Sequence, residues 1–120
     1  MRWINTSGLA ALLPELLKTR VYVGVSAGSM VASKDLLLRQ SQILYGKDLD
    51  ETADMAALRL VNFYVLPHLN SEHFAVRKED VIREAAQGMT APVYALDDQS
   101  ALKVVDGEVE TISEGEWFRV

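Results

Sequence analysis

Apolar residues fall into short runs along the chain, and turn residues separate these runs from amphipathic stretches. Residues 21–25 form a continuous, β-branched run from Val21 to Val25, typical of a strand that is covered on both faces in a parallel sheet. A second run, residues 58–66, is stopped by Pro67, and a third covers residues 93–96. The pattern predicts three strands of a parallel sheet with helices packed on its faces.

The N-terminal half of the pattern is mainly helical. Residues 5–20 carry leucines at helical spacing, and we expect two short helices here, with Pro14 in the first turn of the second. A further helix is expected at residues 27–34, directly after the first strand. Residues 36–45 are apolar but ambiguous, and the acidic residues of 46–54 predict an exposed loop.

The C-terminal half ends in a hairpin. Residues 77–87 place apolar side chains on one face and charges on the other, which predicts an amphipathic helix that ends at Gly88. Two alternating runs, residues 101–105 and 109–112, lie on either side of the dipeptide Asp106-Gly107, a strong hairpin signal. Because 120 residues suffice for one core but not two, we expect a single α/β domain over residues 1–120.

Composition narrows the classes of function. The net charge is −5, and the twelve basic residues are scattered, so a nucleic-acid partner is not expected. There is neither an apolar run of about eighteen residues nor a basic-then-apolar leader, so we expect a cytoplasmic protein with no membrane contact. The chain has no cysteine, which excludes disulfides, thiolate metal sites and a cysteine nucleophile. We expect no metal and no cofactor, and covalent chemistry would rest on Ser or Thr.

A serine turn follows the first predicted strand. Gly24-Val25-Ser26-Ala27-Gly28 has the G-x-S-x-G pattern, which pushes a serine Oγ out of the carboxyl edge of a sheet in a strained conformation. The N–H of Ala27, at the start of a helix, would form half of an oxyanion hole. The alternative is that these small residues fill a tight turn or bind an anion at the helix start.

A serine nucleophile needs a base, and the chain has two histidines. His68 follows the second strand, at the sheet edge where open α/β folds place their sites, and His73 is its rival. An orienting carboxylate would come from Asp97 or Asp98, just after the third strand. Turn chemistry is the alternative explanation for that acidic pair. We predict a catalytic set of Ser26, His68 and Asp98.

The order of these residues distinguishes between families. In α/β-hydrolases the acid precedes the histidine, whereas here the order is Ser26, His68, Asp98, which disfavours an esterase or lipase. The three blocks Tyr22-Val23-Gly24-Val25-Ser26-Ala27-Gly28-Ser29-Met30, Val65-Leu66-Pro67-His68-Leu69-Asn70 and Tyr94-Ala95-Leu96-Asp97-Asp98 resemble those of the peptidase E family, the S51 serine peptidases.

The resemblance implies a flavodoxin-like parallel sheet of the class I glutamine amidotransferase type, flanked by helices. It also implies a serine peptidase that acts on small peptides through an acyl-enzyme on Ser26, with His68 as base. Asp98 stands where the aspartyl dipeptidases of the family carry Glu, and its side chain is one methylene shorter. The family's domain is longer than this chain, so residues 1–120 would form its C-terminal catalytic half.

The missing half would hold the first strands and the second oxyanion donor. The strand at residues 21–25 would then be an open edge, and we expect a homodimer or a complementing chain to cover it. Two other functions stay open. One is a catalytically silent interaction module that holds an anion at Ser26, and the other is a glutaminase-type domain, which Ser26 in place of cysteine disfavours. Arg77 and Lys78 are interpreted as a solvated helix start.

Overall fold

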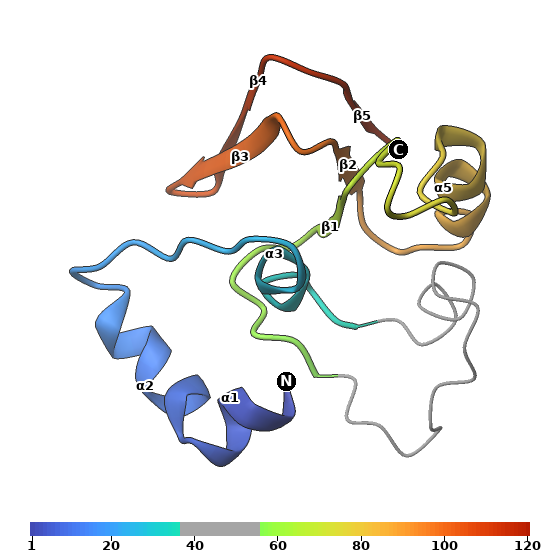
Figure 1. The fold of residues 1–120 in the computed structure, drawn as a ribbon. Coiled ribbons are helices and arrows are strands. Elements are labelled where there is room, and N and C mark those ends of the chain that lie inside the picture. The colour runs from blue at the N-terminus through green and yellow to red at the C-terminus, as the bar shows by residue number, and fades with distance from the viewer. Residues whose placement is uncertain (37–55) are drawn as a thin grey trace.

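The computed structural model describes residues 1–36 and 56–120, so the expectations for residues 46–54 and for most of residues 36–45 lie outside the described residues (Figure 1). No helix in these two ranges is long and apolar enough to cross a membrane. The elements are α1 (Arg2–Thr6), α2 (Leu9–Leu16), α3 (Ala27–Val31), β1 (Tyr64–Pro67), α5 (Glu79–Ala85), β2 (Val93–Leu96), β3 (Ser100–Val105), β4 (Glu108–Ser113) and β5 (Trp117–Arg119).

The central sheet has the order β1-β2-β5. β1 and β2 are parallel, in a register that pairs Tyr64 with Val93 and Pro67 with Leu96, so their carboxyl ends lie side by side. β5 runs antiparallel to β2 and was not expected from the sequence pattern. The fold is thus α/β, with the predicted parallel pair extended by an antiparallel strand.

Both faces of β1 and β2 are buried, which explains why these strands are continuously apolar. On one face, Tyr64 and Leu66 pack with Val93 and with Ile82 of α5, which is fully buried. On the other face, Phe63, Val65 and Leu96 pack against side chains of the β3–β4 hairpin, and Figure 1 shows the hairpin and α5 on different sides of the sheet.

The predictions for the C-terminal half are confirmed with small changes. The helix α5 lies inside the predicted stretch, and Gly88 beyond its end has φ +86°. β3 and β4 pair antiparallel around Asp106 and Gly107, whose φ angles of 52° and 85° are those of a type I′ turn. β2 has the predicted bounds, Val93–Leu96.

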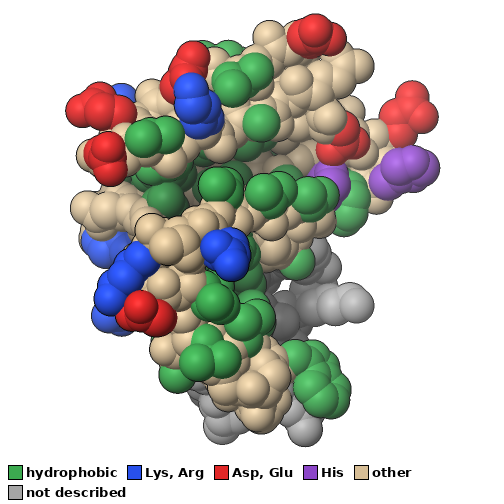
Figure 2. Space-filling view, turned by 90° about the vertical axis from the view of Figure 1, so that its left-hand side faces the viewer, with side chains coloured by type: hydrophobic (Ala, Val, Ile, Leu, Met, Phe, Trp, Pro, Cys, Tyr) green, Lys and Arg blue, Asp and Glu red, His purple; other side chains and the backbone are tan. Residues whose placement is uncertain are grey.

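The buried strand predicted at residues 21–25 is wrong. This segment lies extended between α2 and α3, belongs to no sheet among the described residues, and exposes Val21, Val23 and Val25 by 88%, 80% and 77%. An apolar, β-branched run indicates that its residues favour a buried strand. Burial also requires neighbouring strands, and the described chain places none beside this segment. Figure 2, which faces this side, shows apolar side chains gathered on the surface; Leu9, Leu12 and Leu16 of α2 are also exposed.

Two element boundaries also differ from the expectation. The N-terminal helices are separated at Gly8, which has φ +78°, and Pro14 lies inside α2 rather than in its first turn. The second strand is shorter than residues 58–66, because Leu58 and Leu60 donate backbone hydrogen bonds to the end of α3 and the residue after it instead of to a strand. Pro67 is the last residue of β1, a position where a strand tolerates proline.

Candidate active site

Ser26 has the strained backbone that the G-x-S-x-G pattern predicts. Its φ of 53° and ψ of −118° are strained for a residue with a Cβ, and α3 begins at the next residue. The two glycines of the motif contribute differently. A Cβ on Gly24 would lie 2.6 Å from the carbonyl oxygen of Gly28, whereas a Cβ on Gly28 would meet only the Tyr22 hydroxyl, at 4.0 Å. The close approach that forms the turn therefore depends on Gly24.

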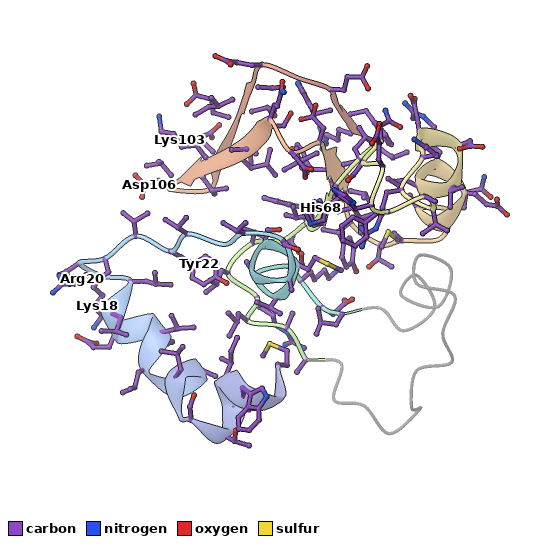
Figure 3. The ribbon with its side chains drawn as sticks, viewed as in Figure 1. Lys18, Arg20, Tyr22, His68, Lys103 and Asp106 are labelled. Carbon is purple, nitrogen blue, oxygen red and sulfur yellow. The ribbon has the colours of Figure 1, made fainter. Side chains whose placement is uncertain are left out.

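Hydrogen bonds within the segment hold this turn. The Tyr22 hydroxyl donates to the carbonyl of Gly28 at 2.7 Å, and the Ser29 hydroxyl donates to the carbonyl of Ser26 at 2.6 Å. Burial raises the pKa of Tyr22, so its hydroxyl stays protonated and remains a donor. Figure 3 shows Tyr22 and His68 on opposite sides of α3. The turn keeps its shape although the segment before it pairs with no strand of the described chain.

His68 lies directly after β1, at the carboxyl edge of the sheet. Its Nε2 is 2.8 Å from the Ser26 Oγ, and its Nδ1 is 2.6 Å from Oδ1 of Asp98. Asp98 follows β2, and the parallel register of β1 and β2 brings the residues after their ends together. The imidazole is 20% exposed and the Asp98 side chain 62% exposed. Three residues that are distant in sequence thus form one line of contacts, as the sequence predicts.

This line has the polarity needed for proton transfer. A carboxylate can only accept, so the contact with Asp98 requires a proton on Nδ1 of His68. A neutral imidazole with that proton has a lone pair on Nε2, which can accept the Ser26 hydroxyl proton. The shorter side chain of Asp98, compared with Glu, reaches the imidazole without a gap.

Asp97 points away from His68 and closes the next loop. Its carboxylate accepts hydrogen bonds from the amides of Gln99 and Glu116 and from the Ser100 hydroxyl, at 3.0, 2.5 and 2.5 Å. Burial raises its pKa, but these hydrogen bonds outweigh burial and hold the pKa of Asp97 below its ordinary value. Of the two acidic residues, Asp98 contacts the histidine, whereas Asp97 stabilises the loop that follows β2.

The second histidine is not at the serine. His73 is exposed, and its amide N–H lies 3.4 Å from the Ser71 hydroxyl. The segment that carries it brings Phe74 onto His68, with ring centroids 4.5 Å apart and planes 12° apart. Sequence patterns gave no signal for this stacked ring, because it depends on how the loop turns.

Arg77 corrects an expectation. It is 0% exposed rather than part of a solvated helix start, whereas Lys78 is exposed as expected. Its Nη1 donates to the carbonyl of Pro67 at 3.2 Å, and its guanidinium carbon is 5.9 Å from the centroid of the Phe74 ring. Charged residues are assigned to the surface by pattern, and only the path of the loop puts this one inside.

Ala27 occupies the place expected of an oxyanion donor. It is exposed and is the first residue of α3, where an N–H group has no acceptor within its own helix. Its amide follows the strained Ser26 directly. Within the described ranges no group of three or more His, Cys, Asp or Glu could hold a metal ion.

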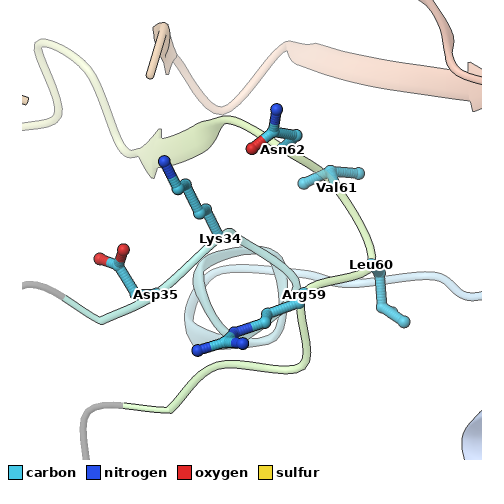
Figure 4. A pocket seen from close by; sticks show the side chains of 6 residues that line it. All are labelled: Lys34, Asp35, Arg59, Leu60, Val61 and Asn62. Carbon is cyan, nitrogen blue, oxygen red and sulfur yellow. The ribbon is translucent and has the colours of Figure 1, made fainter. Parts of the chain in front are cut away.

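An open hollow of about 520 Å³ lies apart from this site, between the residues after α3 and the segment that leads to β1 (Figure 4). It adjoins Asp35, whose carboxylate accepts the Tyr64 hydroxyl at 3.0 Å. Ser26, His68 and Asp98 do not line it, so the hollow does not belong to the serine site; its lining residues are Lys34, Asp35, Arg59, Leu60, Val61 and Asn62.

Comparisons with known proteins all match this chain to peptidases. The model of peptidase family S51 matches residues 1–112. An uncharacterized peptidase of Pasteurella multocida, PM1590, is 27% identical over 113 residues, which cover 91% of this chain and 51% of the relative. The uncharacterized peptidase Lmo0363 of Listeria monocytogenes is 28% identical over 100 residues, or 83% of this chain and 47% of the relative.

A solved structure supports the fold. The crystal structure of a protein assigned as a peptidase E from Listeria monocytogenes EGD-e matches with a TM-score of 0.69 and 24% identity. The match covers 93% of this chain and 52% of the other. The chain therefore spans about half the length of the relatives that it matches.

Proposed function

Because this chain belongs to peptidase family S51, whose model covers residues 1–112, we propose that it carries the catalytic residues of a serine peptidase that hydrolyses small peptides. One observation carries the proposal: the unbroken line from the Ser26 Oγ to His68 at 2.8 Å and from His68 to Asp98 at 2.6 Å. The strained backbone of Ser26 supports it, because such strain is typical of functional serines.

The chemistry follows from this line. His68 Nε2 takes the Ser26 hydroxyl proton while Oγ bonds to the peptide carbonyl carbon, and the carbonyl oxygen becomes an oxyanion. The imidazolium then gives its proton to the leaving amine as the C–N bond breaks, which leaves an acyl ester on Ser26. Water gives a proton to Nε2 as its oxygen bonds to the ester carbonyl carbon; the bond from that carbon to Oγ then breaks, the acid product leaves, and the imidazolium returns the proton to the Ser26 Oγ. Asp98 holds the imidazole and stabilises its charged form.

The oxyanion would receive one hydrogen bond from the Ala27 N–H. A second donor belongs, in this proposal, to the half of the S51 domain that the chain does not match. Loss of one such donor costs about 10²–10³ in kcat. The activity of residues 1–120 by themselves is therefore expected to be low, and acylation by an activated probe is a better measure than turnover.

We propose in addition that further polypeptide covers residues 21–25. The support is the exposure of Val21, Val23 and Val25, together with the relatives, in which about half of each chain has no counterpart here. The occupant is that other half of the S51 domain. In a solution of this chain alone, a second copy takes its place and gives a homodimer, because an exposed apolar segment with unpaired backbone groups pairs with the polypeptide that is available.

A fluorophosphonate probe tests the catalytic proposal. We expect it to modify Ser26, and we expect Ser26→Ala and His68→Ala to abolish labelling while His73→Ala, the matched histidine control, keeps it. A folded wild-type chain that the probe does not label would contradict the proposal. If phosphate or a carboxylate then raised its melting temperature, the silent anion-holding module would be the better account.

A further inference from the structure

The loop between β1 and α5 holds the histidine from two directions. Resting on the proposed function, we infer that Phe74 and Arg77 are positioning residues, which fix the plane of the His68 ring so that Nε2 faces the Ser26 hydroxyl. Their effect passes through His68 and through the backbone that carries it.

The contact with Asp98 cannot orient the ring by itself. A single hydrogen bond from Nδ1 fixes one edge of the imidazole but lets the ring tilt about the Nδ1–Oδ1 line. The lone pair of Nε2 lies in the ring plane, so a tilt turns it away from the Ser26 Oγ. The Asp98 side chain is also 62% exposed, so water competes for its oxygens.

Phe74 supplies the missing constraint. Its ring lies parallel to the imidazole within 12°, at a centroid distance of 4.5 Å, which is a stacked contact between the faces of the two rings. Two flat faces in contact resist tilt while leaving both nitrogens in the ring plane free. Asp98 thus selects the edge of the ring, and Phe74 selects its plane.

Arg77 holds the loop that presents both rings. Its carbonyl accepts the amide of Asn70 at 2.8 Å, its own amide donates to the carbonyl of Phe74 at 2.8 Å, and its guanidinium donates to the carbonyl of Pro67. These bonds join the start, the middle and the end of the loop. His68 and Asn70 have φ angles of 68° and 57°, and such residues keep this conformation only where surrounding contacts require it.

Burial makes this anchor specific to arginine. A guanidinium that is 0% exposed loses its hydration, and the carbonyl of Pro67 and the Phe74 ring replace part of it. Lysine has a charge but no planar fork to place between a carbonyl and a ring. We therefore expect that lysine cannot replace Arg77.

Ring variants at position 74 test the inference. Phe74→Leu keeps an apolar side chain but removes the flat face, and Phe74→Tyr keeps the face as the matched control. In protein labelled with ¹⁵N-histidine, at slightly alkaline pH, two imidazoles are observed, His68 and His73. We expect wild type and Phe74→Tyr to hold His68 with its proton on Nδ1. In Phe74→Leu the Nδ1 shift should stay that of a protonated nitrogen, while the Nε2 shift should move toward that of exposed His73, because a tilted ring turns Nε2 away from the Ser26 hydroxyl.

The probe reaction gives the second readout. Phe74→Leu should slow labelling of Ser26 by about tenfold or more, since a small displacement of reacting groups lowers the reaction rate by up to about 10²-fold. Phe74→Tyr should keep the labelling rate of wild type. Arg77→Lys should have the same effect as Phe74→Leu on both readouts. A purely structural role would lower the melting temperature without changing the Nε2 shift of His68 in the folded protein.

The outcomes separate the two proposals. An unchanged His68 nitrogen spectrum in folded Phe74→Leu would overturn the positioning role, whether or not the chain reacts with the probe. The probe could label wild type and Phe74→Leu at the same rate but fail to label Ser26→Ala. That result would overturn the positioning role and leave the peptidase proposal intact. Failure of wild type to label would contradict the peptidase proposal, while the nitrogen spectra would still decide the role of Phe74.

Discussion

The two glycines of the serine turn are equal in the motif but not in the structure, and alanine at each position separates them. A Cβ on Gly24 would lie 2.6, 2.7 and 2.8 Å from the carbonyl oxygen and carbon of Gly28 and the amide nitrogen of Ser29, all backbone atoms that cannot rotate away. Ordinary contact begins near 3.4 Å, so the turn would have to open by about 0.8 Å.

The cost follows from that displacement. Forcing a methyl group into a packed position costs about 1–3 kcal/mol of stability, and moving Ser26 by close to 1 Å relative to His68 costs up to about 10²-fold in rate. Gly28→Ala is the control: its Cβ would meet only the Tyr22 hydroxyl, and alanine within a helix is favoured over glycine by about 0.5–1 kcal/mol.

Urea unfolding and the rate of fluorophosphonate labelling measure both effects. We expect Gly24→Ala to lose stability and labelling, and Gly28→Ala to match or exceed wild-type stability with labelling retained. Equal losses in the two variants, or a Gly24→Ala variant as stable and reactive as wild type, would refute the assignment of the close approach to Gly24 alone.

Three further predictions concern the carboxylates and the open segment. Asp98→Asn removes the acceptor that selects the His68 tautomer and should slow labelling by about 10³–10⁴-fold, whereas Asp98→Glu should retain most of the rate; an Asn variant as fast as wild type would be contrary. Val23→Lys should convert a dimer of this chain into a monomer in sedimentation, and Val105→Lys, an exposed control on β3, should not; a monomeric wild type would exclude the dimer. Because the folded pKa of Asp97 lies below its ordinary value of 3.8, the stability it adds is present above that pH and is lost as pH falls through the lower value. Asp97→Asn should thus lower the free energy of unfolding by about 1–2 kcal/mol at pH 7, and in urea unfolding this difference should shrink as the pH falls below 3.8; a difference that stays constant as the pH falls would argue against this account.

Sequence predicted the parts of the site that follow from local chemistry. An apolar run that ends at Pro67 predicts where the loop that carries His68 begins, and Val93–Leu96 does the same for Asp98. Parallel pairing of two such strands then brings their ends together without further information. The hairpin was equally local, since Asp106-Gly107 favours its turn whatever surrounds it.

The features that the sequence did not predict depend on contacts with segments that are distant in the chain or absent from it. The antiparallel β5 is short, and its pairing is determined by the edge that β2 offers rather than by its own pattern. The burial of residues 21–25 requires neighbours that the described chain does not supply. Phe74 and Arg77 reach their contacts because His68 and Asn70, which have positive φ angles, turn the loop. The hydrophobic periodicity of a sequence does not indicate such backbone angles.

The site also depends on a link between its two parts. Ser26 belongs to the N-terminal segment, whereas His68 and Asp98 are fixed by the sheet. The 2.8 Å contact between the Ser26 Oγ and His68 Nε2 therefore depends on how stably α3 packs on β1. That docking uses the open edge of β1. The buried Ser33 hydroxyl accepts the amide of Val65 at 3.2 Å, and the amide of Lys34 donates to the carbonyl of Phe63.

These bonds satisfy backbone groups that another strand would otherwise pair with. A segment that follows Ser26 thus covers the edge of the strand that leads to His68, and the serine is placed by the same contacts that protect the sheet edge. Polypeptide that covers residues 21–25 would act on the opposite side of the turn. We therefore expect such a partner to complete the oxyanion hole while leaving the line from Ser26 through His68 to Asp98 as it is.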